Sequence, residues 1–198
     1  MSPIVGSLAN GSTRGYGGLR SFAPDTAFES IATATGTGSS NTITFNSIPG
    51  TYQHLQIRYI GKTAYNQISS SAILFRINGD TGTNYSTHRL IGGGSSAASQ
   101  GYSSQTSFFG LGITNGSTTI VNMMGVGIID IHDYASTTKN KTMRSIFGFD
   151  CNTNNVQEIT LGSGVWLNTS AITSLTLVAN DGNWSTNTQI ALYGIKGA

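Results

Sequence analysis

The residues of this sequence best suited to chemistry are its three histidines, His54, His88 and His132. His132 lies in the run DIHD (130–133), and alternation along a strand would put Asp130 and His132 on the same face. A zinc site needs a third protein ligand, and none is apparent in the neighbouring sequence. We therefore interpret His54 and His132 as half-exposed strand positions, and we expect no metal site.

The segment 78–84 (NGDTGTN) has side-chain oxygens at alternate positions, as a calcium-binding loop does. A calcium loop also needs a bidentate acid further along the chain, and no Asp or Glu follows within reach. A turn held by hydrogen bonds from Asn and Asp side chains explains the same residues. We favour the turn, and calcium binding is the alternative.

Acid–base and nucleophilic catalysis have few candidates. Glu29 and Glu158 are the only glutamates, and the six aspartates fall mostly in turns or at strand ends. A glycosidase needs two facing carboxylates, and no spacing indicates such a pair. The G-x-S-x-G motif of serine hydrolases is absent, and Ser163 in GSG (162–164) belongs to a strand end. We predict that the chain is not an enzyme and has no catalytic or cofactor-binding residues.

Composition excludes several other functions. Charged residues make up only 9% of the chain, whereas it contains 25 Ser, 26 Thr and 26 Gly. The net charge of +2 and the one basic cluster, Lys139, Lys141 and Arg144, fall short of the basic stripe that nucleic-acid binding needs. Cys151 is alone, so folding does not depend on a disulfide. Residues 1–20 lack a charged start followed by an apolar stretch, and no apolar run is long enough to span a membrane, so we expect neither a secretory signal nor a membrane span.

Residues 1–27 differ from the rest of the chain. They contain five glycines and scattered apolar residues, and neither the period of a strand nor that of a helix persists. We interpret this segment as an extended N-terminal arm without a core of its own, which docks on a partner. The docking residues that we expect are Ile4, Val5, Leu8, Arg14, Tyr16, Leu19, Arg20 and Phe22.

Residues 28–198 have the pattern of an all-β domain. In the run 52–60 (YQHLQIRYI), apolar residues alternate with polar ones, and similar runs follow at intervals marked by turn formers. Strands are predicted at 28–36, 42–48, 52–60, 73–78, 86–92, 107–113, 119–133, 142–150, 158–164, 172–180 and 188–195, with long loops at 100–107 and 134–141. Many short strands and no helical period indicate a jelly-roll-like antiparallel β-sandwich. An immunoglobulin-like sandwich is the alternative, although its Cys and Trp landmarks are absent.

Several of these runs carry a resemblance to a known group of proteins. They are FESIA (28–32), ITFNSIP (43–49), YQHLQIR (52–58), FRINGDTGTNY (75–85), DIHDYASTTKNKT (130–142) and IALYGIK (190–196). In this order, over roughly residues 28–198, the chain resembles tailed-bacteriophage virion structural proteins of the capsid decoration and fibre type. The resemblance implies a location on the virion, after assembly in the host cytoplasm.

The function expected from this resemblance is that of a capsid decoration (cement) protein. The arm would dock on the major capsid protein or another virion protein, and the sandwich would stabilise the head. The alternative is a tail-fibre or receptor-binding module that binds a host-surface glycan. Edges with few Lys and Glu favour self-association, and closed symmetry together with the resemblance leads us to expect a homotrimer.

Overall fold

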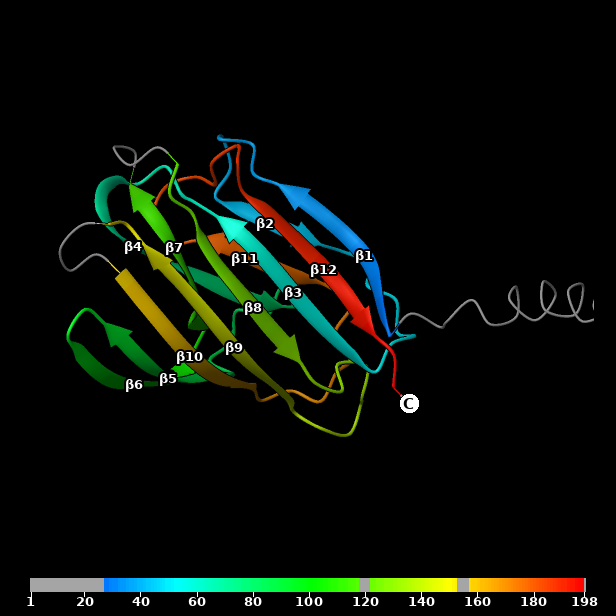
Figure 1. Ribbon diagram of the computed structural model, residues 1–198. Coiled ribbons are helices and arrows are strands. Elements are labelled where there is room, and N and C mark those ends of the chain that lie inside the picture. Colours follow the sequence, from blue (N-terminus) through cyan, green and yellow to red (C-terminus); the bar gives the residue numbers. More distant parts are fainter. Residues whose placement is uncertain (1–26, 118–121, 153–156, 198) are drawn as a thin grey trace, which may run out of the picture.

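The computed structural model describes residues 27–117, 122–152 and 157–197 (Figure 1). At 66–69 and 111–117 only the backbone is described. The predicted arm lies outside the described residues except for Ala27, so all eight of its expected docking residues do as well. No helix in the described ranges is long and apolar enough to cross a membrane.

Twelve strands are described, and they form two antiparallel sheets. The strands are β1 (Phe28–Thr35), β2 (Thr42–Phe45), β3 (His54–Gly61), β4 (Asn66–Ile77), β5 (Tyr85–Gly93), β6 (Ser96–Gln105), β7 (Phe108–Ser117), β8 (Gly125–Ile131), β9 (Lys141–Asp150), β10 (Gln157–Trp166), β11 (Leu175–Ala179) and β12 (Gln189–Ile195). The large sheet has the order β1-β12-β3-β8-β9-β10-β5-β6, and the small sheet has the order β2-β11-β4-β7. Figure 1 shows the large sheet lying across the small one.

Eight of these strands form a jelly roll. If β5, β6, β9 and β10 are set aside, the sheets reduce to β1-β12-β3-β8 and β2-β11-β4-β7. Of the seven connections between consecutive strands of this set, only β4–β7 stays within one sheet, and the other six cross between the sheets, which is the connectivity of two interlocked Greek keys. The predicted jelly-roll-like sandwich is confirmed. We call β5, β6, β9 and β10 the extension, because they continue the large sheet beyond β8 (Figure 1).

The core lies between the two sheets of the jelly roll. Leu55 and Ile57 of β3 and Leu192 of β12 have no exposed surface, and they face Phe75 of β4 and Leu177 of β11 across the sandwich. In β4, β11 and β12 these residues alternate with half-buried neighbours, and in β3 with polar ones, which is the period of two that the sequence pattern predicts. Burial of each such side chain stabilises the fold by roughly 1.5–3 kcal/mol.

A buried lysine closes one end of the sandwich. The Lys141 ammonium is completely buried, and its Nζ donates to the carbonyl oxygens of Ser136 at 2.7 Å, Lys139 at 2.7 Å and Thr169 at 3.0 Å. Burial lowers the pKa of Lys141. This side chain therefore ties the loop before β9 to the loop after β10. The loop that we predict at 134–141 lies here, and only its last residue belongs to β9.

The loop predicted at 100–107 is largely a strand. Residues up to Gln105 belong to β6, which forms a hairpin with β5. Every β6 side chain is exposed or half-buried, because β6 is an edge strand with a single hydrogen-bonded neighbour. Such a strand needs no alternation of apolar and polar residues. Because β6 consists largely of Ser, Ala and Gln, the sequence pattern did not predict it.

Candidate interaction surface

A band of apolar side chains covers part of the outer face of the large sheet, the face turned away from the small sheet. Six of these side chains are 43–61% exposed, and a seventh, Ile128, is half-buried. They come from five neighbouring strands, β3, β8, β9, β10 and β5. We call the set the apolar outer face; its members are Ile60, Leu90, Val126, Ile128, Ile146, Ile159 and Leu161.

Strand register arranges this face in two cross-strand rows. The first row, in the order β3-β8-β9-β10-β5-β6, is Ile60, Val126, Gly148, Ile159, Gly92 and Ala97. The second row, in the same order, is Arg58, Ile128, Ile146, Leu161, Leu90 and Ser99. Together the apolar members expose on the order of 600 Å², at the upper end of the roughly 300–600 Å² typical of the largest patch on a monomer.

Two apolar hollows interrupt the first row where it has glycines. One has a volume of about 360 Å³ and lies over Gly148, with Val126, Ile146 and Ile159 among its walls. The other has a volume of about 310 Å³ and lies over Gly92. Ile159 lines both hollows and, at 61% exposed, forms the ridge between them. The face therefore carries projecting side chains directly beside apolar hollows.

A row of polar residues borders the apolar outer face. Arg144 Nε donates to Asp130 Oδ2 at 3.0 Å, and Gln56 Nε2 donates to Asp130 Oδ1 at 2.7 Å. Arg58 Nε donates to Gln56 Oε1 at 2.7 Å, and the Arg58 guanidinium lies 5.8 Å from the ring centroid of Tyr193. Arg144 and Asp130 neutralise each other, and Arg58 leaves one positive charge at this edge of the patch.

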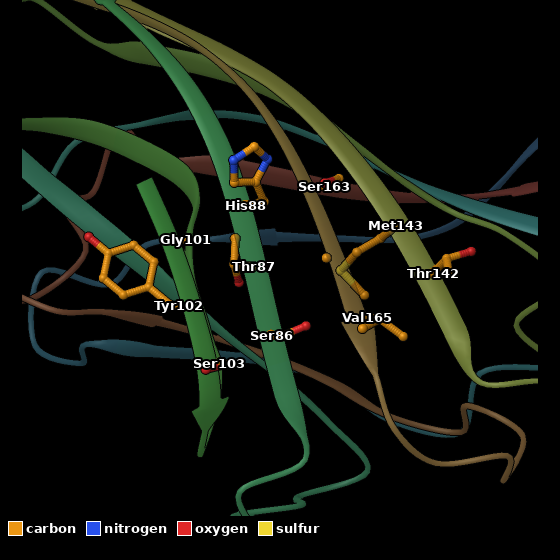
Figure 2. Close-up of a pocket in the computed structure, with 11 residues that line it drawn as sticks. Ser86, Thr87, His88, Gly101, Tyr102, Ser103, Thr142, Met143, Ser163 and Val165 are labelled. Atoms are coloured by element: carbon orange, nitrogen blue, oxygen red, sulfur yellow. The ribbon is translucent and has the colours of Figure 1, made fainter. Parts of the chain in front are cut away.

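A third hollow, of about 530 Å³, lies beyond this polar row (Figure 2). Thr142 of β9, Val165 of β10 and Ser86 of β5 pair across its floor. Figure 2 shows His88 and Ser163 at one end of the hollow and Ser86 and Val165 further along. His88 is the only histidine, lysine, arginine or acid among its lining residues. This hollow offers hydroxyl groups and little charge.

The inner side of the extension is more polar than the jelly-roll core. Arg89 is 8% exposed; its Nε donates to Gln100 Oε1 at 2.9 Å, and its guanidinium lies 5.7 Å from the ring centroid of Phe109. Arg89 Nη1, Thr87 Oγ1 and Ser145 Oγ are buried without a hydrogen-bond partner among the described residues. Buried polar atoms of this kind usually have partners, and the described part of the jelly roll also contains some without one, at Thr63, Ser71, Arg76 and Trp184. The extension combines a partly polar interior with an apolar exterior.

The histidine and aspartate candidates do not form a metal site in the described part of the chain. Within it, no group of three or more His, Cys, Asp and Glu side chains lies close enough to hold an ion. His54 and His132 meet edge to face, with ring centroids 5.0 Å apart, but Asp130 is engaged by Arg144 and Gln56 instead. His54 Nδ1 accepts a hydrogen bond from the backbone N–H of Asp133 at 3.0 Å.

The segment 78–84 forms the turn that the sequence favours. The Asp80 carboxylate accepts hydrogen bonds from the Gly82 N–H at 2.7 Å, Asn84 Nδ2 at 2.9 Å and Trp166 Nε1 at 2.7 Å. The hydrogen bond from Asn84 is the main cause that lowers the pKa of Asp80, with Trp166 and Gly82 adding to it. Because donors already occupy both carboxylate oxygens, this geometry fits an Asx-type turn better than a calcium loop.

The two glutamates do not face each other. Glu29 accepts from Tyr52 Oη and pairs with Lys196, whereas Glu158 accepts from Thr160 Oγ1. Their strands, β1 and β10, are five strand spacings apart in the same sheet, which corresponds to roughly 24 Å. Paired glycosidase carboxylates lie about 5–10 Å apart. Asp130 is nearer to β10, but strand alternation puts it on the opposite face from Glu158.

The apolar outer face was not anticipated from the sequence. The sequence signal that could have revealed it is the presence of two apolar residues in succession within a strand, as at Ile128–Ile129 and Ile146–Phe147. Two successive residues of a strand point to opposite faces of the sheet. A strand with one face in water shows clean alternation. Adjacent apolar residues within a strand therefore indicate that both faces are covered, or that one of them is an interaction surface.

Comparison with known proteins yields little. No protein-family model matches the chain, and no curated protein does. Among solved structures, a GH43 glycoside hydrolase with an engineered active site is 13% identical, covers 88% of this chain and has a TM-score of 0.34. This chain covers only 37% of that hydrolase. A protein of unknown function from Shewanella oneidensis MR-1 is 8% identical, with 86% of this chain and 77% of that chain covered and a TM-score of 0.22. At such TM-scores neither likeness bears on fold or function.

Proposed function

We propose that this chain is a structural protein of a bacteriophage virion, a capsid decoration (cement) protein that stabilises the head by binding other protein chains. The observation that carries the proposal is the apolar outer face, because an apolar patch at the upper end of the range found on monomers is often a functional surface, and another protein chain can cover it. The resemblance of residues 28–198 to virion proteins is the reason for proposing a bacteriophage virion as the assembly.

The chemistry of the described residues supports an assembly role over catalysis. The acids are engaged in turns and pairs, as with Asp80, Asp130 and Glu29. The few charges of the chain also suit a protein packed among others, because charged groups are costly to bury in an interface. The arm, with its eight expected docking residues, would contribute the contact with the shell.

Quantitative mass spectrometry of purified particles from cells that produce this chain tests the proposal. A decoration protein is expected at a copy number comparable with that of the major capsid protein. Deleting residues 2–24 should leave a folded β domain that no longer joins the particles. Absence of the full chain from purified particles would overturn the proposal.

A tail-fibre or receptor-binding module is the second candidate. The hydroxyl-lined hollow in Figure 2 favours it, because Ser86, Ser163 and Thr142 could hydrogen-bond a neutral sugar there. A low copy number per particle, together with glycan-array binding that is lost in Ser163→Tyr and kept in Leu167→Tyr, would favour the fibre role. No glycan binding would leave decoration as the better proposal.

A further inference from the structure

The two rows of the apolar outer face are complementary to themselves. In the first row, projecting side chains and small residues are arranged so that the row read backwards puts Ile60 against Ala97, Val126 against Gly92, and Ile159 against Gly148. Each projecting side chain therefore meets a small residue. A surface with this property can bind a second copy of itself, which is what an interface around a two-fold axis requires.

The second row and the polar border obey the same reversal. Reversing the second row pairs Ile128 with Leu90 and Ile146 with Leu161, so apolar side chains meet apolar side chains. In the polar row, Asp130 of β8 comes to lie opposite His88 of β5. Reversal thus creates no contact between like charges along the three rows.

We propose that two copies of this chain pack through their apolar outer faces, around a two-fold axis. The axis lies between the two faces, above the gap between β9 and β10, and runs parallel to these strands. A rotation about this axis lays β10 of one copy over β9 of the other. Ile159 of each copy then enters the hollow over Gly148 of the other copy. Sheets packed face to face lie about 10 Å apart with their strands within about 30° of each other, so the row-to-row contacts hold near the centre of the face.

The available area suits such a dimer. A stable interface buries about 800 Å² on each partner, and the apolar outer face supplies on the order of 600 Å² of it. The flanking polar row, with Arg144, Ser163 and His88, supplies the remainder. The apolar centre and the polar rim match the usual arrangement of protein interfaces.

This inference deepens the proposed function, since both require the apolar outer face to be covered, but it names the occupant as a second copy of the chain. The first experiment measures the mass of the full-length chain at micromolar concentration by native mass spectrometry and sedimentation. We expect a dimer for the unaltered chain, a monomer for Leu161→Asp and a dimer for Leu167→Asp. Leu167 is a matched control, because both leucines are 56% exposed and only Leu161 belongs to the apolar outer face.

A second experiment tests the axis. Within one chain, Ile60 and Ala97 are five strand spacings apart, roughly 24 Å. The proposed rotation brings Ile60 of one copy and Ala97 of the other to the same end of the first row, within reach of a bismaleimide although not in direct contact. The double variant Ile60→Cys/Ala97→Cys, treated with a short bismaleimide, should give a covalent dimer in high yield. The matched double variant Ile60→Cys/Leu167→Cys should give little.

Several results would overturn the inference. They are a monomeric full-length chain, a mass three times that of the chain (as the homotrimer expected from the sequence would have), and a dimer that persists in Leu161→Asp. Cross-linking in the control double variant equal to that of Ile60→Cys/Ala97→Cys would also contradict the axis. A dimer with the predicted cross-link in a chain that is absent from purified particles would uphold this inference and overturn only the virion role.

Discussion

The two halves of the large sheet distribute their apolar residues differently. In the jelly-roll half, β1-β12-β3-β8, the inner face is apolar and is buried at β12, β3 and β8, as at Ile57 and Leu192. In the extension, the inner side includes Arg89, Thr87 and Ser145, and the outer side carries Ile146, Ile159 and Leu161. The jelly-roll half completes its core within the chain. The extension leaves part of its apolar surface for another chain to bury, together with Ile60 of β3 and Val126 and Ile128 of β8.

The largest effect that tests this contrast is the loss of a core side chain. Ile57→Ala in the jelly-roll half should lower the free energy of unfolding by about 2–5 kcal/mol, because it leaves a cavity between the sheets. Ile146→Ala on the apolar outer face should cost less than about 0.5 kcal/mol in the dissociated chain. Urea denaturation at submicromolar concentration measures both values. Equal losses would contradict the contrast.

A smaller effect is expected for the two cations of β9, one on each face. Lys141→Met removes the ammonium group that donates hydrogen bonds to three backbone carbonyl oxygens. It should lower the free energy of unfolding by roughly 1–3 kcal/mol, because those carbonyls stay buried. Arg144→Met removes an exposed pair with Asp130 and should cost about 0–1 kcal/mol. Thermal unfolding of both variants at one salt concentration compares them. A larger loss for Arg144→Met would show that the outer face matters more to the monomer than proposed.

Two threonines, one in each half, should differ in the sign of their effect on stability when the hydroxyl is removed. Thr188 Oγ1, beside β12, donates to the Lys62 carbonyl at 3.0 Å, so Thr188→Val should cost about 1 kcal/mol. Thr87 Oγ1 in the extension has no hydrogen-bond partner among the described residues. Thr87→Val should therefore be neutral or stabilise the fold by up to about 1 kcal/mol. A clear loss of stability in Thr87→Val would indicate that an ordered partner completes the extension.

The smallest expected effect is a change in pH dependence at the turn that joins β4 to the extension. The pKa of Asp80 is lowered in the folded chain by its hydrogen bonds from Asn84, Trp166 and Gly82. Its contribution is therefore fully present above the unfolded pKa of about 3.9 and is lost as the pH falls through the lower folded pKa. Asp80→Asn should flatten the decline of stability below about pH 4. An unchanged acid limb in urea titrations would contradict this role.

The sequence predicted the jelly roll well, because most of its strands are buried on one face and alternate clearly, as 52–60 does. It missed β6, whose side chains pack on little and follow no period. It also missed the apolar outer face, because which residues belong to that face depends on which strands are neighbours in the sheet. Ile60, Leu90 and Ile159 are far apart in the chain, and only the pairing of β3 with β8 and of β10 with β5 brings them onto one face.

The strand order has a consequence for how the chain folds. In each sheet a strand from late in the chain lies between two early ones: β12 between β1 and β3, and β11 between β2 and β4. During synthesis, β1 and β2 therefore wait for their partners until nearly the whole domain has been made. Pairing over such sequence separations is slow. Until it occurs, the unpaired edges of β1 and β2 are free to pair with those of other nascent chains, which favours aggregation. Coexpression with chaperones that shield unpaired strands should raise the soluble yield without altering the folded product.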